Sequence, residues 1–282
     1  MKFSQTSQQK IDKIIADGAK NLYILADFDG TLTLGIDKNG VQQNNSISVF
    51  RNENFLDEDY VKRSHELKDK YFPLENDHTL PFEKRFKFCQ EWWTKHFELL
   101  REKGLSMKEI EEVLQRNLLH MRTGLKQFLT NTYTAKMPVF VYSASGAGDL
   151  VKLSLKRNGV QGNIEYMINE WITDSKGRFL KTKSIIIHSM NKNGLAIKQH
   201  GSYPKIQGRK NIIILGDGAG DVNMSSDLDY DICLKIGFLN ILETDPKYEE
   251  KRKFYEKIYD IVLPWDSGLE PITEIIKKTY GN

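Results

Sequence analysis

The chain has 282 residues, a length that suits one large folded core carrying a second, smaller module. Its 41 Lys and Arg residues nearly balance its 38 Asp and Glu residues, and a net charge of +3 is too small for a duplex nucleic-acid partner. Cys89 and Cys233 lack CxxC spacing and indicate neither a disulfide framework nor a thiolate metal site. The sequence shows no signal peptide and no run of roughly 20 apolar residues. We therefore expect a cytoplasmic protein without a membrane partner.

Short apolar runs rich in β-branched residues recur along the chain and predict buried strands of a parallel sheet. These runs cover residues 22–26, 139–142, 164–168, 212–215, 232–236 and 261–263. Apolar residues at helical spacing lie between or after them, over 125–129, 150–155 and 269–276. This alternation predicts an α/β fold with a doubly wound parallel sheet.

The stretch between the first two predicted strands is different, because strand-like runs vanish there and apolar residues recur at helical spacing. The helical spacing is clearest over 82–100 and 107–118. Turn-forming residues at 37–40 and 123–124 mark its two seams. We therefore predict that an α/β core is interrupted by a helical cap. The core consists of residues 1–33 and 125–282, and the cap of residues 34–124.

The first predicted strand runs directly into the segment Asp27-Phe28-Asp29-Gly30-Thr31. Ligands of open α/β sheets bind beyond the carboxyl ends of the strands, which is where both aspartates fall. Carboxylates two residues apart can enter one crevice if the chain turns at the step from Asp29 to Gly30. One can then attack an electrophile while the other transfers a proton. Alone, this pattern would more simply be a polar exit from a strand, but other segments match it.

The predicted strand 212–215 runs into the acidic, glycine-rich segment Gly216-Asp217-Gly218-Ala219-Gly220-Asp221. Asp217 and Asp221 are four residues apart, so both carboxylates face one point if a helix begins after Gly218. With Asp27 and the carbonyl oxygen of Asp29 they form an all-oxygen donor set, which predicts a Mg²⁺ site. The alternative is that both aspartates only cap a helix N-terminus.

Two further segments are candidates for binding a phosphate group. Ser143 directly follows the predicted strand 139–142 and opens a glycine-rich turn. Its hydroxyl and the free backbone N–H groups of the turn can face phosphate oxygens, and Ala144 is a candidate for such a contact. A dinucleotide-binding loop is a weak alternative, because Val151 stands where GxGxxG needs its third glycine. Lys192 is a candidate cation for the phosphate, although a single lysine in a polar stretch usually faces solvent.

These elements occur in the order DxDGT, Ser, Lys and GDxxxD, with three of them at strand ends. In this constellation the sequence resembles the haloacid dehalogenase-like (HAD) phosphohydrolases, and among them the cytosolic pyrimidine 5′-nucleotidases of class III. The resemblance spans residues 11–276 and extends beyond the motifs. The additional similar segments are 13–20, 70–75, 234–240 and 259–263.

The resemblance implies a Mg²⁺-dependent phosphohydrolase that removes the 5′-phosphate from nucleoside monophosphates, pyrimidine nucleotides being preferred. Asp27 would be the nucleophile that becomes an aspartyl-phosphate, and Asp29 the acid and base. Mg²⁺ would be held by Asp27, the Asp29 carbonyl group and Asp217, with Asp221 supporting the metal site. We expect a monomer whose partner is the nucleotide substrate.

The resemblance also implies contacts to the substrate from both sides of the site. Ser143 and Lys192 would hold the non-bridging phosphate oxygens. In the cap, Glu75 would contact the base or sugar, and Trp92 or Trp93 would stack on the base. The alternatives are that Glu75 is a helix-start acid in a turn over 73–75, and that at least one of the two tryptophans is cap core.

Three departures from the family pattern leave the substrate open. Gly30 stands where animal members usually have Met, Ser145 lengthens the loop after Ser143 by one residue, and His96 falls at or near a serine linked to base selection. A phosphatase acting on sugar phosphates or other small phosphoesters is therefore an alternative. A non-catalytic phosphate-binding module is a further one, although binding alone needs no paired acid.

Overall fold

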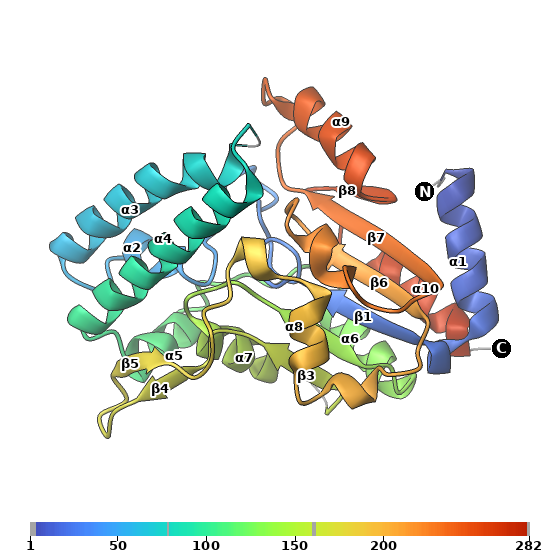
Figure 1. Cartoon of the computed structure of the whole chain (residues 1–282), viewed down its shortest axis with the longest axis horizontal. Coiled ribbons are helices and arrows are strands. Elements are labelled where there is room, and N and C mark those ends of the chain that lie inside the picture. The colour runs from blue at the N-terminus through green and yellow to red at the C-terminus, as the bar shows by residue number, and fades with distance from the viewer. Residues whose placement is uncertain (1–3, 78, 160–161, 281–282) are drawn as a thin grey trace.

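The computed structural model describes residues 4–77, 79–159 and 162–280. Its centre is a six-stranded parallel sheet with the strand order β3-β2-β1-β6-β7-β8 (Figure 1). Its strands are β1 (Leu22–Ala26), β2 (Val139–Tyr142), β3 (Ile164–Met167), β6 (Asn211–Gly216), β7 (Ile232–Leu239) and β8 (Ile261–Pro264). All six predicted strands are confirmed, and so is the doubly wound α/β fold.

Successive residues of each strand pack on opposite faces of the sheet. In β1, Leu22, Ile24 and Ala26 belong to the larger apolar core, whereas Tyr23 and Leu25 belong to a smaller core on the other face. Helices around the sheet are α1 (Gln5–Asp17), α6 (Leu125–Thr134), α7 (Gly148–Arg157), α8 (Gly194–Gln199), α9 (Tyr248–Ile258) and α10 (Glu270–Tyr280). Since both faces are covered, the strands are continuous apolar runs, which made them recognisable.

Between β1 and α6 the described residues form four α-helices. They are α2 (Ser48–Asn52), α3 (Glu58–Asn76), α4 (Phe82–Glu102) and α5 (Met107–Gln115). The helices expected over 82–100 and 107–118 are confirmed, although α5 ends before Leu118. α3 and α4 pack side by side at a distance from the sheet (Figure 1). The division into a core and a cap of residues 34–124 stays a prediction.

A short antiparallel hairpin that the sequence did not predict lies beyond β3. Its strands are β4 (Trp171–Thr173) and β5 (Phe179–Thr182). The strands are too short for a clear period, but Gly177, in the left-handed region at φ 76°, was a turn signal between them. The Gly177 carbonyl accepts from Met107 N–H, and Phe179 N–H donates to the Leu105 carbonyl, both at 2.9 Å. The hairpin therefore ties the sheet domain to the start of α5.

The order of the strands in the sheet determines where a ligand site is expected. The chain moves outward from β1 through β2 to β3, and then returns to β6 on the other side of β1. Ligands of doubly wound sheets bind at this switch point, beyond the carboxyl ends of the two central strands. Short 3₁₀ helices occur at Ala19–Asn21, Ser189–Asn191, Tyr203–Lys205 and Asp221–Ser225. In the described ranges, no helix has both the length and the apolar character needed to span a membrane.

Candidate active site

A cavity of about 360 Å³ lies at the switch point, between the ends of β1, β2 and β6 and the helices α2 to α4. Asp27 and Asp217 enter it side by side, because Ala26 pairs with Leu215 and Asp27 N–H donates to the Leu215 carbonyl at 2.9 Å. The predicted site residues all line this cavity, namely Asp27, Asp29, Glu75, Trp92, Trp93, His96, Ser143, Ala144, Lys192, Asp217 and Asp221. The structure thus brings together residues that lie far apart in the sequence. Their individual roles stay predictions.

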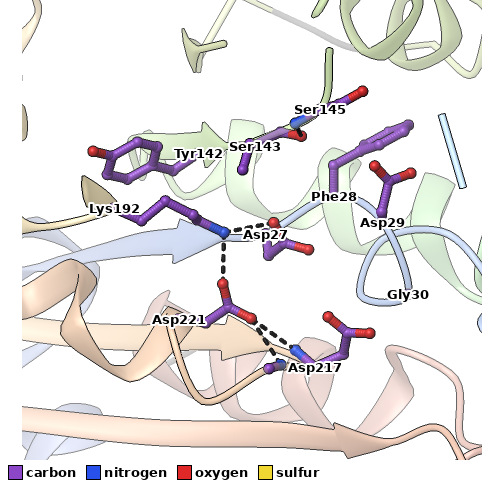
Figure 2. Close-up of polar contacts among 12 residues, drawn as sticks. Asp27, Phe28, Asp29, Gly30, Tyr142, Ser143, Ser145, Lys192, Asp217 and Asp221 are labelled. Carbon is purple, nitrogen blue, oxygen red and sulfur yellow. Dashed lines mark hydrogen bonds and ion pairs between the residues drawn. The ribbon is translucent and has the colours of Figure 1, made fainter. Parts of the chain in front are cut away.

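Lys192 lies at the centre of the charged end of the cavity. Its side chain is 3% exposed, and its Nζ donates to Asp27 Oδ1 at 2.6 Å and to Asp221 Oδ1 at 2.5 Å (Figure 2). Burial disfavours the ammonium charge, but the adjacent carboxylates of Asp221 and Asp27 outweigh burial and hold the pKa of Lys192 above its usual value. The solvent-facing alternative for Lys192 is therefore wrong, and the lysine is a fixed cation beside Asp27.

Three carboxylates meet at this point. Oxygens of Asp27, Asp217 and Asp221 lie within 4.8 Å of one another. Burial, together with the neighbouring Asp221 charge, raises the pKa of Asp217 to about 7. The same burial, only partly offset by Lys192, raises the pKa of Asp27. A hard divalent cation relieves such crowding of like charges, and an all-oxygen donor set fits Mg²⁺.

The three carboxylates are not equivalent. Asp221 has both oxygens engaged, since Lys192 donates to Oδ1 while the N–H groups of Asp217 and Gly218 donate to Oδ2 at 3.0 and 2.9 Å. It begins the 3₁₀ helix Asp221–Ser225, yet its carboxylate closes the loop before that helix rather than capping the helix. Among the residues that the structure describes, only Oδ2 of Asp217 has a hydrogen-bond partner, and it accepts from Asn240 Nδ2 at 3.0 Å. Asp217 therefore keeps an oxygen free for a cation, and Asp221 shapes the loop around it.

Asp29 is held by one residue of the segment that leads to α2. Ser46 N–H donates to Asp29 Oδ1 at 2.7 Å, and the Ser46 hydroxyl donates to Oδ2 at 2.5 Å. The same hydroxyl lies 2.6 Å from Ser145 Oγ. Burial raises the pKa of Asp29, and the two hydrogen bonds from Ser46 partly offset that rise. The residue that lengthens the loop after Ser143 is thus linked through Ser46 to the predicted acid.

The loop after β2 is fixed from several sides. Ser143 is buried and its Oγ accepts from Ser145 N–H at 3.1 Å. The side-chain amide of Asn169 donates to the Ser145 carbonyl at 2.9 Å, and the indole N–H of Trp171 donates to the Gly146 carbonyl at 2.8 Å. Despite the added residue, the loop is therefore fixed by several hydrogen bonds, and Ser143 and Ala144 line the cavity.

A buried arginine, which no sequence feature singled out, supports the turn after Asp29. Arg122 is 1% exposed and forms no ion pair among the residues described. Its N–H groups donate to the carbonyl oxygens of Thr31, Gly30, Trp265 and Ser267 and to Asn240 Oδ1. Burial lowers the pKa of Arg122 to about 10, with Asp217 opposing the decrease. Asn240 in turn donates to the Gly30 carbonyl at 2.9 Å. Both residues are placed by chain segments far from the motifs, so spacing alone gave no signal.

The opposite wall of the cavity comes from α3 and α4. Trp92 stacks on Tyr71 and on Trp93, with ring centroids 6.3 and 5.9 Å apart. Trp93 also packs against the apolar core, so for this residue the packing alternative holds alongside exposure to the cavity. His96 is buried and its Nε2 has no partner within the described residues.

Glu75 lies in the last turn of α3, with Pro73 inside the helix, and not in a turn or at a helix start. That alternative is wrong because α3 continues through Pro73 as far as Asn76, although proline cannot donate a backbone hydrogen bond. The Glu75 carboxylate accepts from the Ser189 hydroxyl, and burial raises its pKa. Glu75 therefore reaches the cavity from the C-terminal end of its helix.

The family model for pyrimidine 5′-nucleotidase (UMPH-1) matches residues 31–280. A 7-methylguanosine phosphate-specific 5′-nucleotidase B of Xenopus laevis is 31% identical over 272 residues, covering 96% of this chain and 91% of that protein. The crystal structure of cytosolic 5′-nucleotidase IIIB bound to cytidine has a TM-score of 0.80 at 25% identity, covering 99% of this chain and 94% of that one. A HAD family hydrolase from Salmonella enterica shares the fold, with a TM-score of 0.57 at 16% identity over 93% of this chain and 73% of that one. The chain therefore belongs to the pyrimidine 5′-nucleotidase (UMPH-1) family and is a 5′-nucleotidase built on the HAD-type phosphatase fold.

Proposed function

We propose that the protein is a Mg²⁺-dependent phosphohydrolase that releases the 5′-phosphate of nucleoside monophosphates, pyrimidine nucleotides being preferred, through an aspartyl-phosphate intermediate. The observation that carries this proposal is the buried contact between Lys192 and Asp27, 2.6 Å apart, in a cavity that Asp29 also lines. A binding module needs no such paired acid, and family membership favours nucleotides over sugar phosphates.

The two aspartates divide the chemistry. A carboxylate oxygen of Asp27 attacks phosphorus, and the bond from phosphorus to the 5′-oxygen breaks while Asp29 gives that oxygen a proton. The nucleoside leaves, and the Asp29 carboxylate then takes a proton from water as the water oxygen attacks phosphorus. Inorganic phosphate leaves and Asp27 is regenerated. The burial that raises the pKa of Asp29 favours the protonated form needed in the first step.

The charged groups around Asp27 would stabilise the phosphoryl group. Asp27, the Asp29 carbonyl oxygen and Asp217 would hold Mg²⁺, and Asp221 would support them. When bound, the ion neutralises charge between Asp27 and the phosphate. Lys192, together with the Ser143 hydroxyl and the N–H of Ala144, would bind the non-bridging oxygens.

The helical side of the cavity would select the nucleoside. Trp92 and Trp93 would stack on the base, and Glu75 would contact the base or sugar. The frog relative is named for 7-methylguanosine phosphate, and the solved neighbour holds cytidine. Both names support a nucleoside in this position. We also propose that residues 34–124 act as the cap, that the protein works as a monomer, and that it resides in the cytoplasm.

The test is phosphate release from UMP, CMP, AMP, GMP, 7-methyl-GMP and several sugar phosphates, with and without Mg²⁺. We expect Mg²⁺-dependent turnover that is highest for pyrimidine nucleotides and absent in Asp27→Asn, since that variant loses the nucleophile with little change of shape. Turnover of sugar phosphates alone would keep the Asp27 chemistry but reject the nucleotide substrate. Inactivity towards every nucleoside monophosphate would reject the proposal.

A further inference from the structure

The helices that form one end of the substrate cavity carry buried polar atoms that have no hydrogen-bond partner among the described residues. Arg51 Nε, Tyr60 OH and His96 Nε2 are buried and have no hydrogen-bond partner there. Tyr60 and His96 are 0% and 4% exposed, so both side chains are shielded from bulk solvent. Buried polar groups are almost always hydrogen-bonded, so an unpaired one needs a structural or functional explanation.

These three groups lie together. The rings of Tyr60 and His96 meet edge to face with centroids 6.3 Å apart, and the Arg51 charge acts on both of them. They come from three different helices, Arg51 from α2, Tyr60 from α3 and His96 from α4. Arg51 and His96 both line the cavity that holds Asp27. Arg51 and His96 are therefore part of the substrate cavity, at the end built by the helices, and Tyr60 packs against His96 without lining the cavity itself.

The cluster is positively charged and offers mainly donors. Burial and the nearby Arg51 charge lower the pKa of His96 to about 3, so the imidazole is neutral at physiological pH. Arg51 makes no ion pair with a described carboxylate, and Lys68 adds a second cation to the same lining. From α2, α3 and α4 the only acid lining the cavity is Glu75, whose carboxylate already accepts from Ser189.

We propose that Arg51 and His96, with Tyr60 packed against His96, form a subsite for a nucleobase edge rich in oxygen acceptors and free of positive charge, uracil being the simplest example. Guanidinium N–H groups bind carbonyl or carboxylate oxygens and cannot accept from an amino group. A cationic 7-methylguanine would face Arg51 with like charge, so this subsite disfavours the base for which the frog relative is named. The inference deepens the proposed nucleotidase function and rests on it.

The test compares kcat/KM for UMP, CMP and 7-methyl-GMP at slightly acidic pH, where the 7-methylguanine base is cationic. We expect the protein to favour UMP over each of the other two by about tenfold or more, because a hydrogen bond to a charged group contributes on that scale. Arg51→Gln should raise KM for UMP and reduce this preference by about tenfold, while Arg51→Lys should keep much of the discrimination against 7-methyl-GMP. Arg116→Gln is the matched control, since Arg116 pairs with Glu53 outside the cavity.

A binding measurement separates this inference from the proposed function. Asp27→Asn protein is titrated calorimetrically with UMP and 7-methyl-GMP, with and without Arg51→Gln, so that affinity is read without turnover. If no nucleotide is hydrolysed but UMP binds more tightly in an Arg51-dependent manner, the subsite stands and the proposed reaction fails. If nucleotides are hydrolysed but UMP and 7-methyl-GMP are treated alike, or Arg51→Gln leaves their ratio unchanged, the subsite is overturned and the reaction stands.

Discussion

Ser46 binds both carboxylate oxygens of Asp29, its N–H at 2.7 Å from Oδ1 and its hydroxyl at 2.5 Å from Oδ2. Both bonds stabilise the carboxylate, so they lower the pKa of Asp29 against the rise caused by burial. Ser46→Ala removes one of them, and we expect the pKa of Asp29 to rise further. Because the proposed acid must be protonated, kcat/KM falls as pH increases through this pKa, and the variant should show that fall at higher pH.

The measurement is the pH profile of kcat/KM with UMP for wild type, Ser46→Ala and Ser46→Thr, the last of which keeps a hydroxyl. Ser48→Ala is the control, since within the described part of the chain the Ser48 hydroxyl bonds only to the backbone of Asn45, in its own turn. We also expect kcat of Ser46→Ala to drop about tenfold, since a hydrogen bond to a charged group is lost. A profile identical to that of wild type would show that Ser46 does not position Asp29.

Arg122 should affect stability and activity together. Its side chain ties the turn at Gly30 and Thr31 to Trp265 and Ser267, and lysine cannot reproduce a five-donor fork. Arg122→Lys should lower the free energy of unfolding by about 3 kcal/mol, because buried carbonyl groups lose their partners. It should also reduce kcat/KM, since the turn carries Asp29.

Arg209→Lys is the matched control for Arg122→Lys. Arg209 also donates to carbonyl oxygens, those of Ala19 and Leu22. These lie at the N-terminal end of β1, which is the end far from the cavity. Denaturant unfolding and UMP turnover should show that Arg209→Lys loses stability alone. If both variants lost the same fraction of activity for each kcal/mol of lost stability, Arg122 would contribute only to the stability of the fold and not to the position of Asp29.

The sheet and the charged end of the site were predictable because their signals are local. A strand buried on both faces is a continuous apolar run, and an aspartate directly after such a run can be recognised in the sequence as a candidate site residue. Ser46, Arg122 and Asn240 gave no such signal, since each meets Asp29 or its turn only through the tertiary fold. Arg51 was missed for the same reason, as an arginine in a short polar helix is ordinarily solvent-facing.

Loss of the carboxylate charge at Asp217 and at Asp221 should weaken Mg²⁺ binding to different extents. Asp217 keeps one oxygen free of described partners, whereas both oxygens of Asp221 bind Lys192 or backbone N–H groups. We expect Asp217→Asn to weaken Mg²⁺ binding about a hundredfold, and Asp221→Asn about tenfold, as is typical of a group that supports a ligand. Calorimetric titration with Mg²⁺ measures both. Equal losses would place Asp221 among the direct ligands.

Mg²⁺ affinity should increase with pH. Burial raises the pKa of Asp217 to about 7, so below that pH a proton occupies the carboxylate that the ion needs. Binding constants measured by calorimetry should therefore tighten as pH rises through about 7. Asp217→Asn, which has no proton to displace at this position, should show a flatter dependence. Affinity that is constant across this range would mean that Asp217 is already ionised in the metal-free protein.

In this chain Gly30 allows both a left-handed backbone and a close approach to Asp217. Its φ is 73°, and a Cβ atom there would lie 2.1 Å from Asp217 Oδ2. Gly104 has a similar φ of 70° but open space around the same position. Gly104→Ala should thus lose only the cost of a left-handed alanine, about 1 kcal/mol. Gly30→Ala carries that cost and also forces the Asp217 carboxylate to move, so it should reduce Mg²⁺-dependent turnover well below that of Gly104→Ala.

The comparison is made by denaturant unfolding and UMP hydrolysis on both glycine variants. If Gly30→Ala kept wild-type turnover and matched Gly104→Ala in stability, Asp217 would have room to move without loss of function. The position of Asp217 would then not depend on the close approach of Gly30, and the residue after Asp29 would be free to vary. Loss of turnover in Gly30→Ala alone would instead show that the turn after Asp29 sets the position of the carboxylate proposed to bind Mg²⁺.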